Sequence, residues 1–165
     1  MTSVLDSAIA DSVYAPAGPV SAPTPLGLPA QAYRIVRAGA RPLHFHGSEL
    51  AMAMSYTPAL PYWYEVNLYR TTAQRFVVAI RQFFQSEDEQ DVCHAWECET
   101  LPEALDRLET YDAAQDVRLG ALPGDGASPA DLHAMALDLR AQSIAARRHY
   151  GSLIGRFFYD LEKDQ

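Results

Sequence analysis

The chain has 165 residues, of which 48% are hydrophobic, and its formal net charge is −8 at pH 7. A chain of this length can form one domain with additional segments, and its hydrophobic core can be stable without disulfides or structural metals. Two cysteines are too few to indicate a disulfide framework. The acidic balance disfavours binding to a nucleic acid backbone, which needs clustered Lys and Arg.

The same features predict a cytoplasmic protein that does not bind a membrane. No apolar run approaches the ~20 residues that a membrane-spanning helix needs. No Lys or Arg precedes Arg34, so we expect no signal peptide. Free cysteines are typical of a reducing compartment, and a lone lysine, Lys163, beside many arginines suggests a bacterial style.

Composition divides the chain into four segments. Residues 1–30 are rich in Pro and Ala, which predicts an extended arm, because proline suits neither a helix interior nor a sheet ladder. Residues 31–120 are expected to form an antiparallel sheet with one helix. Residues 121–127 are expected to be a loop, and residues 128–165 a long C-terminal helix.

Residues 33–100 show hydrophobicity of period two, with β-branched and aromatic residues between Pro, Gly and acidic turns. This pattern predicts strands near 32–37, 42–46, 49–56, 62–71, 75–85 and 92–99. Their connections are short enough for an antiparallel meander of about five to six strands. The fold class is therefore expected to be α+β.

One face of this sheet is expected to form the core, because side chains alternate between the two faces of a strand. Its predicted members are Leu50, Met52, Met54, Tyr56, Tyr64, Val66, Leu68, Phe76, Val78 and Ile80. This apolar face needs a cover. The helix that follows the last strand is expected to provide it.

Two helix starts carry capping boxes, in which a Ser or Thr side chain caps the helix and an acidic residue follows three positions later. In the first, Thr100 precedes Glu103, and the apolar stripe Leu101, Leu105 and Leu108 faces the sheet. In the second, Ser128 precedes Asp131. The second helix has a heptad-like seam of Leu132, Ala136, Leu139, Ser143, Ala146, Tyr150, Leu153 and Phe157.

The second helix is too long for a compact body. Uninterrupted to Lys163, it would span ~54 Å at 1.5 Å per residue, whereas a compact chain of this size is ~40 Å across. It must therefore break or project. Gly151 and Gly155 are the candidate site of a break, or they let another backbone approach closely. A continuous or gently kinked helix is slightly favoured, because the apolar stripe runs across both glycines.

His44 and His46 are a candidate metal pair. On a strand they point to the same side with Cα atoms ~6.6 Å apart, and Glu49 follows. Two histidines at this separation can both bind zinc or iron. The favoured interpretation is that they lie on the polar face of a strand whose Leu43 and Phe45 point inward.

The order Gly39, His44, His46 and Glu49 resembles the first metal motif of the cupin family. The resemblance covers only this short stretch. The glycine lies one residue too near the first histidine, Glu49 lies too near the second, and no later stretch supplies the second cupin motif. We therefore assign no family, and we expect no cofactor.

The segment DVCHAWECET places Cys93, His94 and Cys98 close together in sequence. On a strand, residues five apart emerge from opposite faces, with Cα atoms ~16 Å apart. Neither a disulfide nor a shared zinc is then expected. The carboxylates of the preceding turn, residues 87–91, are interpreted as a solvated turn.

The second face of the sheet is the strongest candidate for a binding surface. Trp63, Tyr69, Arg81 and Phe83 are expected to rim a shallow floor of Ala51, Ala53 and Ser55. Aromatic and arginine side chains are enriched at interaction hot spots. Alternatively, the C-terminal helix covers this face within the same chain.

These observations favour a non-enzymatic interaction or assembly subunit that binds a protein partner or a second copy of itself. Its expected contact residues are Trp63, Tyr69, Arg81, Phe83, Tyr150, Leu153 and Phe157, together with the N-terminal arm. A small metal-dependent enzyme using His44, His46 and Glu49 is the alternative. An acidic mimic of nucleic acid is disfavoured because the charges are not arrayed at phosphate-like spacing.

Overall fold

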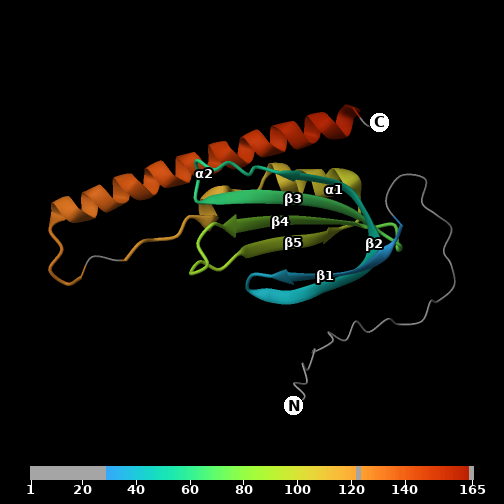
Figure 1. Cartoon of the computed structure of the whole chain (residues 1–165), viewed down its shortest axis with the longest axis horizontal. Coiled ribbons are helices and arrows are strands. Elements are labelled where there is room, and N and C mark those ends of the chain that lie inside the picture. Colours follow the sequence, from blue (N-terminus) through green and yellow to red (C-terminus); the bar gives the residue numbers. More distant parts are fainter. Residues whose placement is uncertain (1–28, 122–123, 164–165) are drawn as a thin grey trace, which may run out of the picture.

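A computed structural model describes residues 29–121 and 124–163, and in it the chain forms a five-stranded antiparallel sheet with helices (Figure 1). The strands are β1 (Gln31–Arg37), β2 (Ala40–Met54), β3 (Tyr62–Thr71), β4 (Phe76–Phe84) and β5 (Val92–Cys98), in that spatial order. They are followed by α1 (Leu101–Glu109), the short 3-10 helix η1 (Ala113–Asp116) and α2 (Pro129–Lys163). The predicted α+β meander is confirmed. The predicted N-terminal arm falls mainly on residues 1–28, which lie outside the described residues.

The predicted strands 42–46 and 49–56 are a single strand, β2. Its first half pairs with β1 and its second half pairs with β3. The register with β3 shifts between Glu49, opposite Tyr69, and Ala51, opposite Leu68, so Leu50 is an extra residue. Such a bulge reverses the faces of all following side chains.

The predicted faces of β2 are therefore wrong beyond Leu50. Leu50 itself packs against the core, as do Ala51 and Ala53. Met52 and Met54 lie opposite Asn67 and Glu65 on the second face. The predicted shallow floor of Ala51, Ala53 and Ser55 does not exist there, because methionines take its place.

Gly47 lies where β2 changes partner. A Cβ atom at this position would lie 2.3 Å from the backbone oxygen of Arg70. No flexible side chain can move aside to relieve that contact, because the neighbouring atoms belong to the backbone. The sequence therefore needs glycine here to let β2 run this close to β3.

We expect Gly47→Ala to lower the free energy of unfolding by about 2–3 kcal/mol, because the strands must separate to admit the methyl group. Urea denaturation of both proteins measures the effect. Gly151→Ala is the matched control, since a Cβ there meets no atom within 4 Å, and it should raise stability by up to about 1 kcal/mol. Equal stability of Gly47→Ala and the parent chain would contradict the packing described here.

The hairpin of β1 and β2 folds across the second face of the sheet (Figure 1). The backbone nitrogen of Ala38 donates to the oxygen of Cys93 at 2.8 Å, which brings the hairpin tip to β5. A small second core forms beneath the hairpin. It contains Ile35, Tyr69, Val77, Ala79 and Ala95, with Tyr33, Leu43, Phe45 and Cys93 packed against it.

Helix α1 begins as predicted. The Thr100 side chain accepts a hydrogen bond from the backbone nitrogen of Glu103 at 3.3 Å, and the Glu103 carboxylate accepts from the backbone nitrogen of Glu99. Ala104 and Leu108 are its buried residues, while Leu101 is partly buried against the core. The helix lies on the core face of the sheet.

Helix α2 is continuous from Pro129 to Lys163 and passes through both glycines. Its start is capped as predicted, because the Ser128 hydroxyl accepts from the backbone nitrogen of Asp131 and donates to its carboxylate. Its 35 residues span about 52 Å at 1.5 Å per residue. Within the described part of the chain, no other backbone approaches Gly151 or Gly155.

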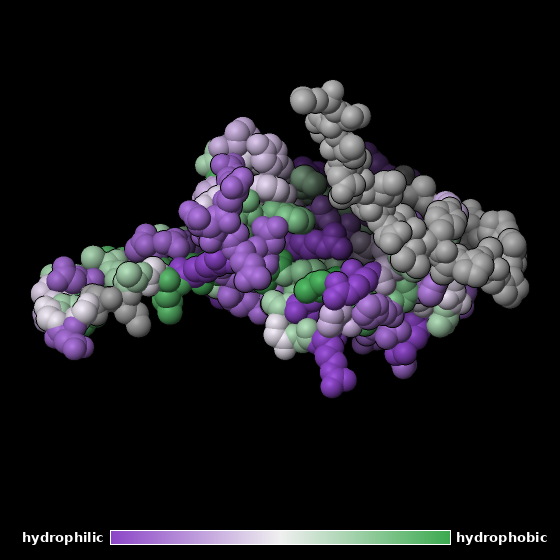
Figure 2. All heavy atoms as spheres, turned by 60° about the horizontal axis from the view of Figure 1, so that its bottom comes forward, coloured by the Kyte–Doolittle hydropathy of each residue, from purple (hydrophilic) through white to green (hydrophobic). Residues whose placement is uncertain are grey.

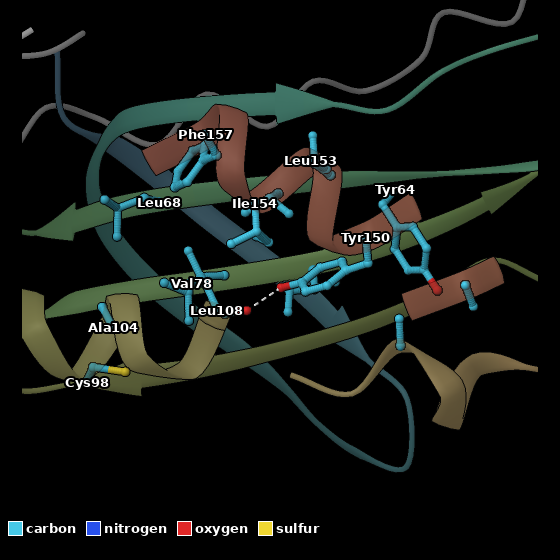
Figure 3. Packing of buried hydrophobic residues seen from close by; sticks show 14 residues of the cluster. Tyr64, Leu68, Val78, Cys98, Ala104, Leu108, Tyr150, Leu153, Ile154 and Phe157 are labelled. Carbon is cyan, nitrogen blue, oxygen red and sulfur yellow. Dashed lines mark hydrogen bonds between the residues drawn. The ribbon is translucent and has the colours of Figure 1, made fainter. Parts of the chain in front are cut away.

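The C-terminal half of α2 packs on the same face as α1, so the prediction that it covers the second face is wrong (Figure 3). Figure 3 shows Tyr150, Leu153, Ile154 and Phe157 reaching from α2 towards β3 and β4. The buried core residues are Tyr64, Val66, Leu68, Val78, Ile80, Cys98, Ala104, Leu108, Ala113, Ala146, Tyr150, Leu153, Ile154 and Phe157. None of the described helices has the length and apolarity to span a membrane.

Candidate interaction surfaces

The second face of the sheet has a covered end and an open end. The hairpin covers Tyr69, Val77 and Ala79, but it leaves the far ends of β2, β3 and β4 open. At this open end Met52 is 53% exposed and Tyr56 is 56% exposed. In Figure 2, which brings this side of the molecule forward, hydrophobic atoms are exposed among hydrophilic ones.

Aromatic rings join the methionines at the open end. The Trp63 ring stacks on Phe83 with centroids 5.5 Å apart, and Tyr56 meets the edge of Trp63 at 5.3 Å. We call Met52, Met54, Tyr56, Trp63 and Phe83 the aromatic strip. Methionine side chains adapt well to a partner surface, and aromatic side chains are enriched at interfaces.

Three of the four sheet residues predicted to bind a partner lie together. Trp63 and Phe83 belong to the aromatic strip, and Arg81 lies beside them, paired with Glu65 at 2.9 Å. Tyr69 does not join them, because it is only 2% exposed. The rings of Tyr33 and Phe45 cover it, with centroids 4.7 and 5.4 Å away.

A hollow of about 520 Å³ borders the aromatic strip. It lies between the hairpin tip, the end of β4, the start of β5 and Arg118. Its lining includes Arg37, Arg81, Arg118, Phe83 and Cys93. Burial raises the pKa of the Cys93 thiol although Arg81 opposes this, so the thiol stays protonated at neutral pH.

The N-terminal half of α2 is the second candidate surface. Between Pro129 and Ala145 no side chain is buried, and this part extends past the ends of the strands (Figure 1). Leu132 is 49% exposed, and Met135 and Leu139 lie one and two turns further on the same side. This side continues the seam that is buried from Ala146 onwards. We call residues 129–145 the projecting helix.

The three helix residues predicted to bind a partner lie inside the chain's own core. Tyr150, Leu153 and Phe157 are each at most 4% exposed, and the Tyr150 hydroxyl donates to the backbone oxygen of Leu108 at 2.7 Å. They anchor α2 to the sheet. A contact with another molecule would therefore use the projecting helix instead.

A buried polar cluster lies at one end of the core, and sequence reasoning missed it. The Asp116 side chain, 2% exposed, accepts hydrogen bonds from the hydroxyls of Tyr64 at 3.0 Å and Tyr111 at 2.7–2.8 Å. The Nε2 atom of His94 lies 3.4 Å from the same carboxylate. The cluster ties η1 to strands β3 and β5.

Desolvation and the nearby carboxylate affect the tyrosines of this cluster. Burial, followed by the charge and hydrogen bonds of Asp116, raises the pKa of both Tyr64 and Tyr111 well above the ordinary value. Burial likewise raises the pKa of Tyr150. All three hydroxyls therefore remain protonated donors at neutral pH. This arrangement fits a structural lock that joins η1 to the sheet.

The candidate metal residues His44 and His46 lie on the polar face of their strand, as the favoured interpretation expected. His44 and His46 are exposed, while Leu43 and Phe45 pack against the second core. The Glu49 carboxylate accepts a hydrogen bond from the Asn67 side chain at 3.3 Å. In residues 29–121 and 124–163, no three His, Cys, Asp or Glu side chains are grouped to hold a metal ion.

The cysteines separate as predicted: Cys98 lies in the main core, and Cys93 packs against the second core on the opposite face. Both are free. No protein family model, no curated protein and no solved structure matches this chain.

Proposed function

We propose that the chain is a non-enzymatic interaction subunit that presents the projecting helix to an apolar groove on a protein partner. The main support for this proposal is that the N-terminal half of α2 extends beyond the sheet and contains no buried side chain. The apolar seam of α2 nevertheless continues along this exposed half. Helix-in-groove recognition uses such a seam, with anchors spaced three and four residues apart. Leu132, Met135 and Leu139 have this spacing.

The projecting helix is expected to be folded already in the absence of a partner. Five of its residues are alanine, the best helix former. Its start is capped by Ser128, and its far end continues into the anchored half of α2. A helix of this length alone would be marginal in water, so anchoring lowers the ordering cost that binding would otherwise carry.

We expect Leu132→Glu combined with Leu139→Glu to weaken partner binding by at least about 30-fold, because two apolar anchors become charged in a desolvated groove. Proteins captured from a native cell extract by the parent chain are identified, purified and titrated against both forms. Ala134→Glu with Ala141→Glu is the matched control, since it adds the same charge on the opposite side of the exposed helix. Equal affinity of the seam variant and the control would contradict the proposal.

A further inference from the structure

The hollow beside the aromatic strip contains fixed positive charges. The Arg37 guanidinium donates to the backbone oxygens of Arg41 at 2.8 Å and Ala95 at 3.3 Å. The Arg118 guanidinium lies 4.4 Å from the centre of the Phe84 ring and donates to the backbone oxygen of Gln90. Neutral groups thus hold both side chains in place, and held guanidiniums lose little entropy when they bind a carboxylate.

These two charges are not neutralised in the described part of the chain. Neither Arg37 nor Arg118 has a carboxylate oxygen within 4.0 Å among residues 29–121 and 124–163. The third arginine of the hollow, Arg81, is paired with Glu65. Asp91 also lines the hollow, but its carboxylate accepts from the backbone nitrogen of Phe84 at 3.1 Å. The lining carries three arginines against one aspartate.

An acidic turn adjoins the hollow. It connects β4 to β5 and carries Glu87, Asp88 and Glu89, which form no ion pair within the described residues. Its last residues, Gln90 and Asp91, belong to the hollow itself. Positive and negative groups therefore lie side by side at the open end of the second sheet face.

We propose that two copies of the chain pair about a two-fold axis at this end, so that the acidic turn of each copy enters the arginine-lined hollow of the other. A two-fold interface brings one surface patch against itself, which requires a self-complementary patch. Because each copy has both an acidic turn and an arginine-lined hollow, a two-fold dimer contains two such contacts between opposite charges.

The apolar groups nearby suit the same contact. Phe83 lines the hollow, Trp63 stacks on Phe83, and Met54 and Tyr56 extend the apolar surface. Pairing would remove the aromatic strip from water, while the ion pairs would fix the register and suppress other partners. This dimer is independent of the projecting helix, so either proposal can fail alone.

Charge reversal tests the dimer. In the turn variant, Glu87, Asp88 and Glu89 are replaced by Lys; in the hollow variant, Arg37 and Arg118 are replaced by Glu. Sedimentation equilibrium of the full chain at low salt should give a dimer for the parent chain and a monomer for each variant alone. An equimolar mixture of the two variants should form a dimer again, because each acidic or basic surface then meets its opposite.

The expected weakening is at least about 10-fold in dimer affinity for each variant, and dimerisation of the parent chain should weaken as salt rises. A control variant with Asp106, Glu109 and Asp160 replaced by Lys, all exposed positions elsewhere, should remain a dimer. The milder Arg37→Gln with Arg118→Gln replaces the hollow variant if near-ultraviolet circular dichroism shows that the latter is unfolded. A monomeric parent chain at ~1 mM, or a mixture that stays monomeric, would overturn the proposal.

Discussion

Asp116→Ala is expected to lower the free energy of unfolding by about 3–5 kcal/mol, the range typical of removing one partner from a buried charged network. The change leaves the Tyr64 hydroxyl buried without its acceptor, because Tyr64 is 0% exposed. It also releases Tyr111, whose hydroxyl contacts both carboxylate oxygens. A buried donor without a partner costs about 1–3 kcal/mol.

Chemical denaturation at pH 7 measures this loss. Asp106→Asn is the control, since Asp106 is exposed on α1 and its side chain forms no hydrogen bond among the described residues; it should change stability by less than about 0.5 kcal/mol. Asp116→Asn keeps an acceptor and should cost less than Asp116→Ala. A loss below about 1 kcal/mol for Asp116→Ala would show that the cluster does not hold η1 to the sheet.

The Asp116 cluster could not be predicted from the sequence, because its members come from separate elements. Tyr64 lies on β3, His94 lies on β5, Tyr111 precedes η1 and Asp116 is the last residue of η1. Aspartate after a helix is a common turn residue, so Asp116 carries no local signal of burial. Only the packing of η1 under the sheet makes the carboxylate accept from two tyrosines.

Local sequence signals, in contrast, correctly predicted most of the strands and both helix starts. Alternating hydrophobicity located β3 at 62–71, and the two capping boxes at Thr100 and Ser128 located both helix starts. Alternation also separated Cys93 from Cys98 correctly. These features depend on neighbours within a few residues, and such neighbours are visible in one sequence.

The face of β2 was predicted wrongly for a physical reason. Alternation from Leu50 onwards fits either face, because Met52 and Met54 are as apolar as a core requires while Ala51 and Ala53 are small. The bulge at Leu50 decides between them. A bulge arises from pairing with a distant strand, and no residue near Leu50 predicts it from the sequence.

The position of α2 was similarly undetermined. Its apolar seam and its length followed from the sequence, but the choice between breaking and projecting was left open, and the structure shows a continuous, projecting helix. The sequence did not show which face of the sheet α2 covers, because both faces carry large apolar side chains. The hairpin of β1 and β2 occupies one face, and this leaves the other for α2.

Raising the pH above 10 is expected to unfold the protein, because the native state holds protons on tyrosines that the unfolded chain releases. Burial raises the pKa of Tyr64, Tyr111 and Tyr150 from an ordinary value of 10.0, and it raises that of Tyr69 to about 12. Above pH 10 the unfolded state therefore binds fewer protons than the native state, so stability falls as pH rises. Each such tyrosine contributes about 1.4 kcal/mol per pH unit.

For a domain of ordinary stability, this slope places the unfolding midpoint at about pH 11–12. Tyrosinate absorbance near 295 nm and near-ultraviolet circular dichroism, followed together, should show one cooperative transition for the buried tyrosines. Tyr111→Phe should make the fall of stability above pH 10 shallower by about 1.4 kcal/mol per pH unit, since one shifted group is removed. If those tyrosines ionised gradually from pH 10 while the dichroism stayed native, their hydroxyls would be reaching water, and the sealed packing of η1 and α2 against β3 would be wrong.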